Sequence, residues 1–351
     1  MIRSSALSFL LMLGALQAFA GFAEGEAAYI AKNYATALRE FRPLAAKGHA
    51  DAQLLLGLMY HEGDGVARDY KEAVKWYGLA AAQGNAGAQA NLGWMYANGL
   101  GVAQDYKEAV KWYRLAAAQG NAGAQANLGY IYRDGEGVAQ DYKEAVKWYR
   151  LAAAQGNAKA QYNLGEIYAN GQGVPRDDKE AIKWYRLAAE QGRADAQLSL
   201  GLMYEGGGEG VAQDDKGAVK WYRLAAEQGN DIAQLGLGQM YYQGHGVAQD
   251  YKEAVKWYRL AAAQGSAGAQ ANLGYMYAKG DGVAQDYKEA VKWCRLAAAQ
   301  GNDGAQANLG WMYASGKGVP RDYKEAVKWY RLAAEQGNAE AQTRLKALKK
   351  P

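Results

Sequence analysis

The chain has 351 residues, of which 50% are hydrophobic and 22% are charged, and its formal net charge is +4. This amount of apolar surface excludes a disordered chain, and the mild, evenly interspersed charge does not indicate nucleic-acid binding. Cys294 is the only cysteine, which excludes a disulfide framework.

Residues 1–20 have the form of a secretory signal peptide, with Arg3 before an apolar run and a small-x-small site that ends at Ala20. We expect cleavage after Ala20 and a periplasmic or secreted mature protein. The apolar run from Ala6 to Leu16 is too short to cross about 30 Å of hydrocarbon, and no second such run follows. We therefore expect no integral membrane segment after cleavage.

Residues 21–51 are expected to form a capping helix pair. Tyr34 and Ala37 keep the places they have in the later repeats, but Glu40 and Pro43 replace the usual Trp and Leu. Terminal units of a repeat array need a polar outer face, so this departure is typical of a cap.

A Lys-Trp pair recurs every 36 residues, with one step of 37, and its Trp residues are Trp76, Trp112, Trp148, Trp184, Trp221, Trp257, Trp293 and Trp329. Such a period indicates stacked supersecondary units. We assign eight repeats to residues 52–340, each a first helix, a loop and a second helix, here termed helix A and helix B.

Helix A combines small residues such as Ala88 and Gly93 with large apolar ones. Glycine costs about 1 kcal/mol of helix propensity relative to alanine, so we expect close helix packing there to compensate. The following Gly-x-Gly-Val loop, as at Gly99 to Val102, lacks the Lys-Ser/Thr of a phosphate-binding loop and occurs in every repeat. It is interpreted as a helix end and a turn.

Helix B is expected to begin after an Asp such as Asp105, with Glu108 as its capping-box partner. Its apolar residues fall on one face and its Lys, Glu and Arg residues on the other, which we interpret as solvated. Gly120 is a candidate for the left-handed position after the helix, and Asn121 for the N-cap of the next helix. Such short links favour antiparallel neighbours.

Two irregularities follow along the chain. Residues 205–238 include the one residue that lengthens a repeat from 36 to 37. They also have Gly217 where Glu is usual and Gly236 where Asn is usual, so we expect a local weak point or bend. Residues 341–351 are expected to form a last A-type helix that caps the array.

The pattern Ala-Gln-x-x-Leu-Gly-x-Met-Tyr, Gly-x-Gly-Val and Asp-x-x-Glu-Ala-x-x-Trp-Tyr-x-x-Ala-Ala-x-Gln-Gly resembles the Sel-one-like repeat, a branch of the tetratricopeptide superfamily. The resemblance covers the chain from about Ala23 to its end. It implies an all-α fold, a right-handed solenoid of antiparallel helix pairs, and a role as an adaptor between proteins rather than an enzyme.

One stripe on helix A varies between repeats where packing positions do not. Its three positions, exemplified by Asn91, Trp94 and Asn98, lie on one helix face, which lines the concave groove in tetratricopeptide relatives. Its middle position is occupied in turn by Leu58, Trp94, Tyr130, Glu166, Leu202, Gln239, Tyr275 and Trp311. The candidate partner-binding residues are Asn91, Trp94, Asn98, Asn127, Tyr130, Asn163, Glu166, Asn272, Tyr275, Asn308 and Trp311.

Asparagine can donate to and accept from a peptide backbone, while Trp and Tyr offer large contact area with few rotatable bonds. The alternative is that these aromatics pack between successive A helices as part of the core. Glu166 and Gln239 favour the groove, because a polar side chain buried there without a partner would be costly.

No catalytic or metal-binding constellation emerges. His49, His61 and His245 have no ligand-like spacing, and Cys294 occupies a slot that Tyr258 and Tyr330 fill in neighbouring repeats. We expect no cofactor, no metal and a monomer whose partner is a protein or peptide.

Two other functions stay open at this point. A penicillin-binding or β-lactamase-like activity has been proposed for a cysteine-rich branch of the family, but that branch carries paired cysteines that this chain lacks. Binding of cell-wall glycan is the other, because Trp and Tyr flanked by amides also stack on sugars.

Overall fold

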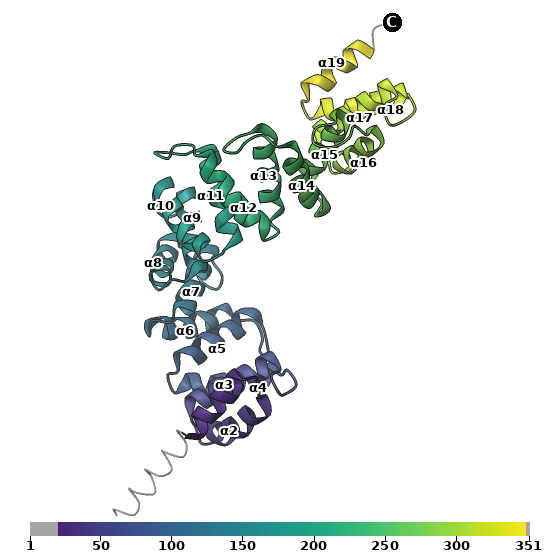
Figure 1. Cartoon of the computed structure of the whole chain (residues 1–351). Coiled ribbons are helices and arrows are strands. Elements are labelled where there is room, and N and C mark those ends of the chain that lie inside the picture. The colour runs from purple at the N-terminus through teal and green to yellow at the C-terminus, as the bar shows by residue number, and fades with distance from the viewer. Residues whose placement is uncertain (1–19, 349–351) are drawn as a thin grey trace, which may run out of the picture. The chain divides into compact units, whose positions relative to one another are not determined.

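The computed structural model describes residues 20–348, so the predicted signal segment lies outside the described residues up to residue 19. The described chain is a succession of α-helices, and its only β-type pairing is an isolated bridge between Gly208 and Val211. Each helix packs on the one that follows it within the same unit, as Figure 1 shows. The prediction of an all-α solenoid of helix pairs is confirmed.

The chain divides into two compact units, residues 1–176 and 177–351. Unit 1 opens with a helix at residues 20–30. Its later helices are α2 (Tyr34–Ala46), α3 (Ala50–Glu62), α4 (Tyr70–Ala82), α5 (Ala86–Asn98), α6 (Tyr106–Ala118), α7 (Ala122–Asp134), α8 (Tyr142–Ala154) and α9 (Ala158–Asn170).

Unit 2 contains the irregular repeat and the C-terminal helix. Its helices are α10 (Asp178–Glu190), α11 (Ala194–Gly206), α12 (Asp215–Glu227), α13 (Asp231–Gln243), α14 (Tyr251–Ala263), α15 (Ala267–Lys279), α16 (Tyr287–Ala299), α17 (Asp303–Ser315), α18 (Tyr323–Glu335) and α19 (Ala339–Leu348). Odd-numbered helices from α3 onward are A helices and even-numbered ones are B helices.

The helix ends form largely as the local sequence predicts. The Asp105 carboxylate accepts from the backbone N–H of Glu108 at 3.0 Å, and the Asn121 side chain accepts from that of Ala124 at 2.8 Å. Gly120 has φ +88°, in the left-handed region that favours glycine. These caps hold the links between helices to a few residues.

The predicted capping box is wrong in one of its two bonds: the Asp105 side chain accepts as expected, but the Glu108 side chain does not accept from the N–H of Asp105. The backbone N–H of Asp105 donates to the carbonyl of Tyr96 at 2.9 Å and leaves no donor for Glu108. The Glu108 carboxylate instead accepts from the Lys111 ammonium at 2.5 Å. The N–H of Asp105 is therefore already bonded to the preceding A helix, and the Glu108 carboxylate pairs with Lys111 instead.

The A and B helices of one repeat meet where a glycine faces an aromatic ring. A Cβ built on Gly93 of α5 would stand 2.9 Å from Cδ1 of Tyr113 in α6. Tyr113 is buried, and the Trp112 beside it packs on the apolar cluster that α4 and α5 form together. The two helices of a repeat are therefore held together by a close glycine–tyrosine contact.

Buried glutamines connect successive repeats by a route that the sequence analysis did not identify. The Gln125 side chain of α7 donates to the carbonyl of Ala117 at 3.2 Å and accepts from the Gln155 side chain at 2.8 Å. The same pair of bonds recurs along each unit, for example at Gln234 with Ala226 and Gln264. Since the amide is buried, losing either bond would leave a polar atom without a partner.

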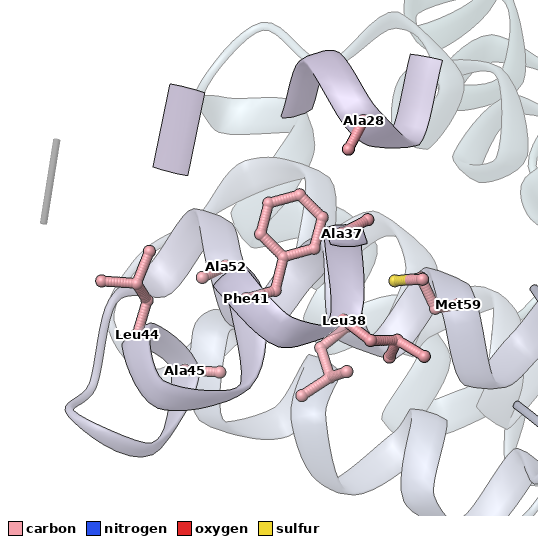
Figure 2. Close-up of a cluster of buried hydrophobic side chains, with 9 residues drawn as sticks. Ala28, Ala37, Leu38, Phe41, Leu44, Ala45, Ala52 and Met59 are labelled. Carbon is pink, nitrogen blue, oxygen red and sulfur yellow. The ribbon is translucent and has the colours of Figure 1, made fainter. Parts of the chain in front are cut away.

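The first helix and α2 share an apolar cluster with α3, which Figure 2 shows around Phe41 of α2. Phe41 stands where Tyr77 stands in the next repeat and is fully buried. Its ring approaches the first helix so closely that a Cβ on Gly25 would lie 2.6 Å from it. α2 continues through Pro43 to Ala46.

The irregular repeat keeps both of its helices. α11 ends at Gly207 with ψ −171°, outside the left-handed helical conformation that Gly99 and Gly135 adopt after their helices. The longer loop is held by the buried carboxylate of Asp178, which accepts from the backbone N–H of Glu209 at 2.7 Å. The expected weak point in this repeat stays a prediction.

Candidate functional site

The aromatic residues of the stripe are partly exposed, although Trp311 also packs on two apolar clusters of the C-terminal repeats. Trp94 is 38% exposed and Tyr275 is 39% exposed, while Tyr130 and Trp311 are half-buried. Each also leans on a neighbour: Trp94 meets His61 edge-on at 5.3 Å between ring centroids, and Trp311 lies 6.2 Å from Tyr287. These contacts fix the rings without removing them from solvent.

The other occupants of the middle position are not core residues either. Leu202 is 49% exposed, Gln239 is exposed, and Leu58 and Glu166 are half-buried. A position that accepts Trp, Glu and Gln with so little burial is not set by packing. This explains the variation between repeats from which the stripe was identified.

In unit 1 the stripe residues line two shallow pockets. One, of about 300 Å³, lies between α5 and α7 and is lined by Trp94, Asn98, Tyr106, Asn127, Tyr130, Glu136 and Lys159, among others. The second, of about 290 Å³, is lined by Leu58, His61, Glu62, Tyr77, Asn91, Trp94 and Met95. Trp94 lines both, so the two hollows are neighbours along one face.

In unit 2 a pocket of about 530 Å³ lies at the C-terminal repeats. Its lining includes Tyr275, Lys279, Tyr287, Asn308, Trp311, Lys317, Glu340 and Arg344. A small hollow of about 40 Å³ beside it is lined by Tyr242, Tyr258, Asn272, Tyr275 and Met276. Most of the predicted residues of each unit are thus brought together in pockets, while Asn163 and Glu166 line none of these four.

Three stripe asparagines are hydrogen-bonded to buried tyrosines of the preceding B helix. Asn127 donates to the hydroxyl of Tyr113, and Asn91 and Asn272 do the same for Tyr77 and Tyr258. Burial raises the pKa of these hydroxyls, and the asparagine bond partly opposes the rise. These amides therefore build the floor of the stripe.

The other three predicted asparagines, Asn98, Asn163 and Asn308, do not bond to a buried tyrosine of the described chain. Asn163 is buried and accepts from the Arg133 guanidinium at 3.3 Å, and Asn98 donates to the carbonyl of Trp94 one turn back at 2.8 Å. Asn308 lies in the repeat after Cys294, where the tyrosine hydroxyl is missing. Within the described chain the Asn308 side chain has no hydrogen bond, and it lines the large pocket.

The sequence analysis missed the residues that give these pockets their charge. Glu136 and Lys317 occupy the variable position of the Gly-x-Gly-Val loop, and Lys159, Glu340 and Arg344 come from the following A-type helix. Comparison of this loop position between repeats, from Asp64 and Leu100 to Lys317, would have shown the variation.

His49 and Cys294, two of the residues considered for chemistry in the sequence, have structural surroundings. His49 caps α3 by accepting from the backbone N–H of Ala52 at 3.2 Å, and burial raises the pKa of the Cys294 thiol to about 12. In residues 20–348 no group of three or more His, Cys, Asp or Glu side chains is placed to hold a metal ion. In the same range no helix is both long and apolar enough to cross a bilayer.

The Sel1 repeat family model matches the chain eight times, at residues 50–85, 86–121, 122–157, 158–192, 194–230, 231–266, 267–302 and 304–338. A protective antigen of uropathogenic Escherichia coli that displays an SLR fold is similar in structure, with 42% identity and a TM-score of 0.86 over 89% of this chain and 67% of the antigen. A Sel1 repeat protein from Oxalobacter formigenes has 38% identity and a TM-score of 0.63 over 89% of this chain and 90% of its own. No curated protein matches the sequence.

Proposed function

This chain belongs to the Sel1 repeat family, and from that premise we propose that it is an exported scaffold that holds an extended peptide or a partner domain along the helix-A stripe. Sel1 repeat proteins generally mediate protein–protein interactions. The single observation that carries the proposal is the half-exposed state of Trp94, Tyr130, Tyr275 and Trp311 in the pockets of the two units.

Such aromatics suit recognition. Each ring offers much contact area for two rotatable bonds, and packing on His61 or Tyr287 removes part of that freedom before a partner arrives. Hot spots of protein interfaces are enriched in Trp and Tyr. The pockets are open and shallow, as a surface for a peptide requires, rather than deep enough to enclose a small substrate.

An enzymatic role has less support. The thiol of Cys294 is fully buried against Gly274 and protonated at neutral pH, so it is a poor nucleophile. The paired cysteines of the penicillin-associated branch are missing from this sequence. Absence of nitrocefin turnover by the purified protein is the expected result.

Export is part of the proposal and rests on the signal-like pattern of residues 1–20. Expression of the full chain in a Gram-negative host, followed by fractionation and N-terminal sequencing, tests it. We expect a periplasmic or secreted product that begins at Gly21. A product that keeps Met1 in the cytoplasm would contradict export and leave the binding surface untouched.

The binding test is affinity capture from an envelope extract. The mature protein is compared with a stripe variant in which Trp94, Tyr130, Tyr275 and Trp311 are all changed to Ala. A matched control changes Leu115, Leu151, Leu260 and Leu296, which are 45–50% exposed on the B helices, to Ala. Circular dichroism and thermal melting establish that all three are folded.

We expect the protein and the control to capture the same partner and the folded stripe variant to lose it. Loss in the leucine control alone would place the interface on the B helices and reject the groove. A parallel pull-down on peptidoglycan separates a glycan ligand from a protein one, because glycan binding would persist without any protein in the extract.

A further inference from the structure

The pocket at Trp94 and Tyr130 in unit 1 and the pocket at Tyr275 and Trp311 in unit 2 are the same site five repeats apart. A shift of 181 residues superposes one lining on the other in the sequence. Both have aromatic residues at three positions: Trp94, Tyr106 and Tyr130 in the first, and Tyr275, Tyr287 and Trp311 in the second. The aromatic frame is thus shared.

The charged residues on that frame are not shared. Where unit 1 has Asn98, Glu136 and Lys159, unit 2 has Lys279, Lys317 and Glu340, and Asn163 is replaced by Arg344. The unit 2 pocket has three cationic side chains against one carboxylate, a net charge of +2. The unit 1 pocket has one of each and a net charge of zero.

Lys317 is held in place before any ligand binds. Its ammonium nitrogen lies 4.6 Å from the Tyr287 ring centroid and 5.0 Å from that of Trp311, and it donates to the Tyr287 hydroxyl at 2.9 Å. An ammonium has three donors, so this bond leaves others for a ligand. Fixing the side chain beforehand lowers the entropy lost on binding.

Lys279 and Arg344 surround the same space. The Lys279 ammonium lies 5.6 Å from the Tyr275 ring centroid, and Arg344 is 3.4 Å from the Glu340 carboxylate. That ion pair is exposed and weak, so Arg344 can turn to another anion. Asn308 lines the pocket with an amide that no other described residue uses.

From this charge complementarity we infer that the unit 2 pocket binds a carboxylate of the partner peptide, with a neighbouring apolar side chain of the peptide against Trp311 and Tyr275. The equivalent pocket of unit 1 does not take this group, because Glu136 stands where Lys317 stands. This assignment rests on the function proposed above and adds the chemistry of the ligand.

The experiment uses the full mature chain labelled with 5-fluorotryptophan, whose fluorine resonances are assigned for Trp311 and Trp94 from Trp311→Phe and Trp94→Phe. The probes are three N-acetylated, C-amidated heptapeptides that are identical except for a central Glu-Glu, Gln-Gln or Lys-Lys pair beside a Leu. A fourth peptide keeps Gln-Gln but has a free C-terminal carboxylate. Trp94 provides the control site inside the same molecule.

We expect the Glu-Glu peptide to shift the Trp311 resonance but not that of Trp94, and to bind at least about tenfold more tightly than the Gln-Gln peptide. Added salt should weaken it. The variant Lys279→Asn with Lys317→Glu, which installs the residues of unit 1, should lose about tenfold or more of this affinity. A response to the fourth peptide instead of the first would assign the carboxylate to a chain end.

Equal responses to Glu-Glu and Gln-Gln peptides, or equal shifts of Trp311 and Trp94, would overturn the inference. Full affinity in the double variant would do the same. If a captured partner depends on the four stripe aromatics while no carboxylate peptide moves Trp311, the proposed function stands and this inference fails. If the Glu-Glu peptide binds but the captured partner does not depend on the four stripe aromatics, this inference stands and the proposed function fails.

Discussion

Gly93 and Tyr113 are in such close contact that a single added methyl group would not fit between them: its carbon would stand 2.9 Å from Cδ1 of the ring and 3.2 Å from the carbonyl oxygen of Ala109. The same relationship joins Gly57 to Tyr77 and Gly310 to Tyr330. It sets the distance between the two helices of a repeat, and through that distance the position of the stripe.

Gly93→Ala is therefore expected to destabilise the chain by about 1–3 kcal/mol, although alanine is the better helix former. The matched control is Gly78→Ala in α4, where an added Cβ meets no atom within 4 Å. That change should stabilise by up to about 1 kcal/mol. Urea denaturation gives the free energy of unfolding of both variants and shows whether packing or helix propensity dominates. A Gly93→Ala variant that is more stable than wild type would show that the close contact with Tyr113 does not limit the packing.

The asparagine–tyrosine bond makes a second prediction. Asn127→Ala removes the donor to the buried Tyr113 hydroxyl and should cost about 1–3 kcal/mol. Asn308→Ala, at the same position in a repeat that has Cys294 in place of the tyrosine, should be close to neutral. Tyr113→Phe in the Asn127→Ala background should recover part of the loss. Equal costs at the two asparagines, in chemical denaturation, would mean that the bond contributes nothing.

The irregular repeat gives a third prediction. α11 follows Arg193, which makes no side-chain N-cap bond, and is itself followed by Gly207 outside the left-handed helical conformation. α12 has Gly217 in its first turn, where the regular B helices have Glu. We expect faster amide hydrogen exchange in α11 and α12 than in α5 and α6, which have their caps. Exchange as slow in α11 and α12 as in the regular repeats would show that the Asp178 anchor offsets the missing caps.

The sequence predicted those features of the fold that depend on neighbours along the chain. Asp105, Gly120 and Asn121 act within three residues of themselves, so their roles follow from residue type and position. The Gln125–Gln155 and Lys317–Tyr287 bonds could not be predicted in this way, since they join residues from different elements and depend on how the helices pack.

The helix-A stripe could be predicted from the sequence only in part. Its aromatics were identified because they vary where packing residues do not, and that argument needs only the repeat period. The roles of its asparagines required coordinates, because the hydroxyls they bond belong to the preceding B helix. A purely periodic comparison treats Asn127 and Asn308 alike, and the structure separates them through Tyr113 and Cys294.

Cys294 supplies the last prediction, which concerns pH. Burial raises the pKa of its thiol from 9.0 to about 12, so the folded chain keeps the proton in a range where the unfolded chain releases it. Its contribution to stability is complete below about pH 9 and is lost as the pH rises toward the folded pKa. The stability of wild type relative to Cys294→Ala should therefore fall by roughly 2–3 kcal/mol between about pH 8 and pH 11. Denaturation midpoints of the two proteins at both pH values measure this difference. Because both proteins contain the same buried tyrosines, the titration of those tyrosines cancels in the comparison.

At about pH 8 the native thiol of Cys294 should also resist a disulfide reagent that reacts at once with the unfolded chain, because reagent and thiolate meet only when α16 opens from α15. Rapid labelling of the native chain, or a stability difference that stays constant with pH, would show that the thiol is reached by solvent.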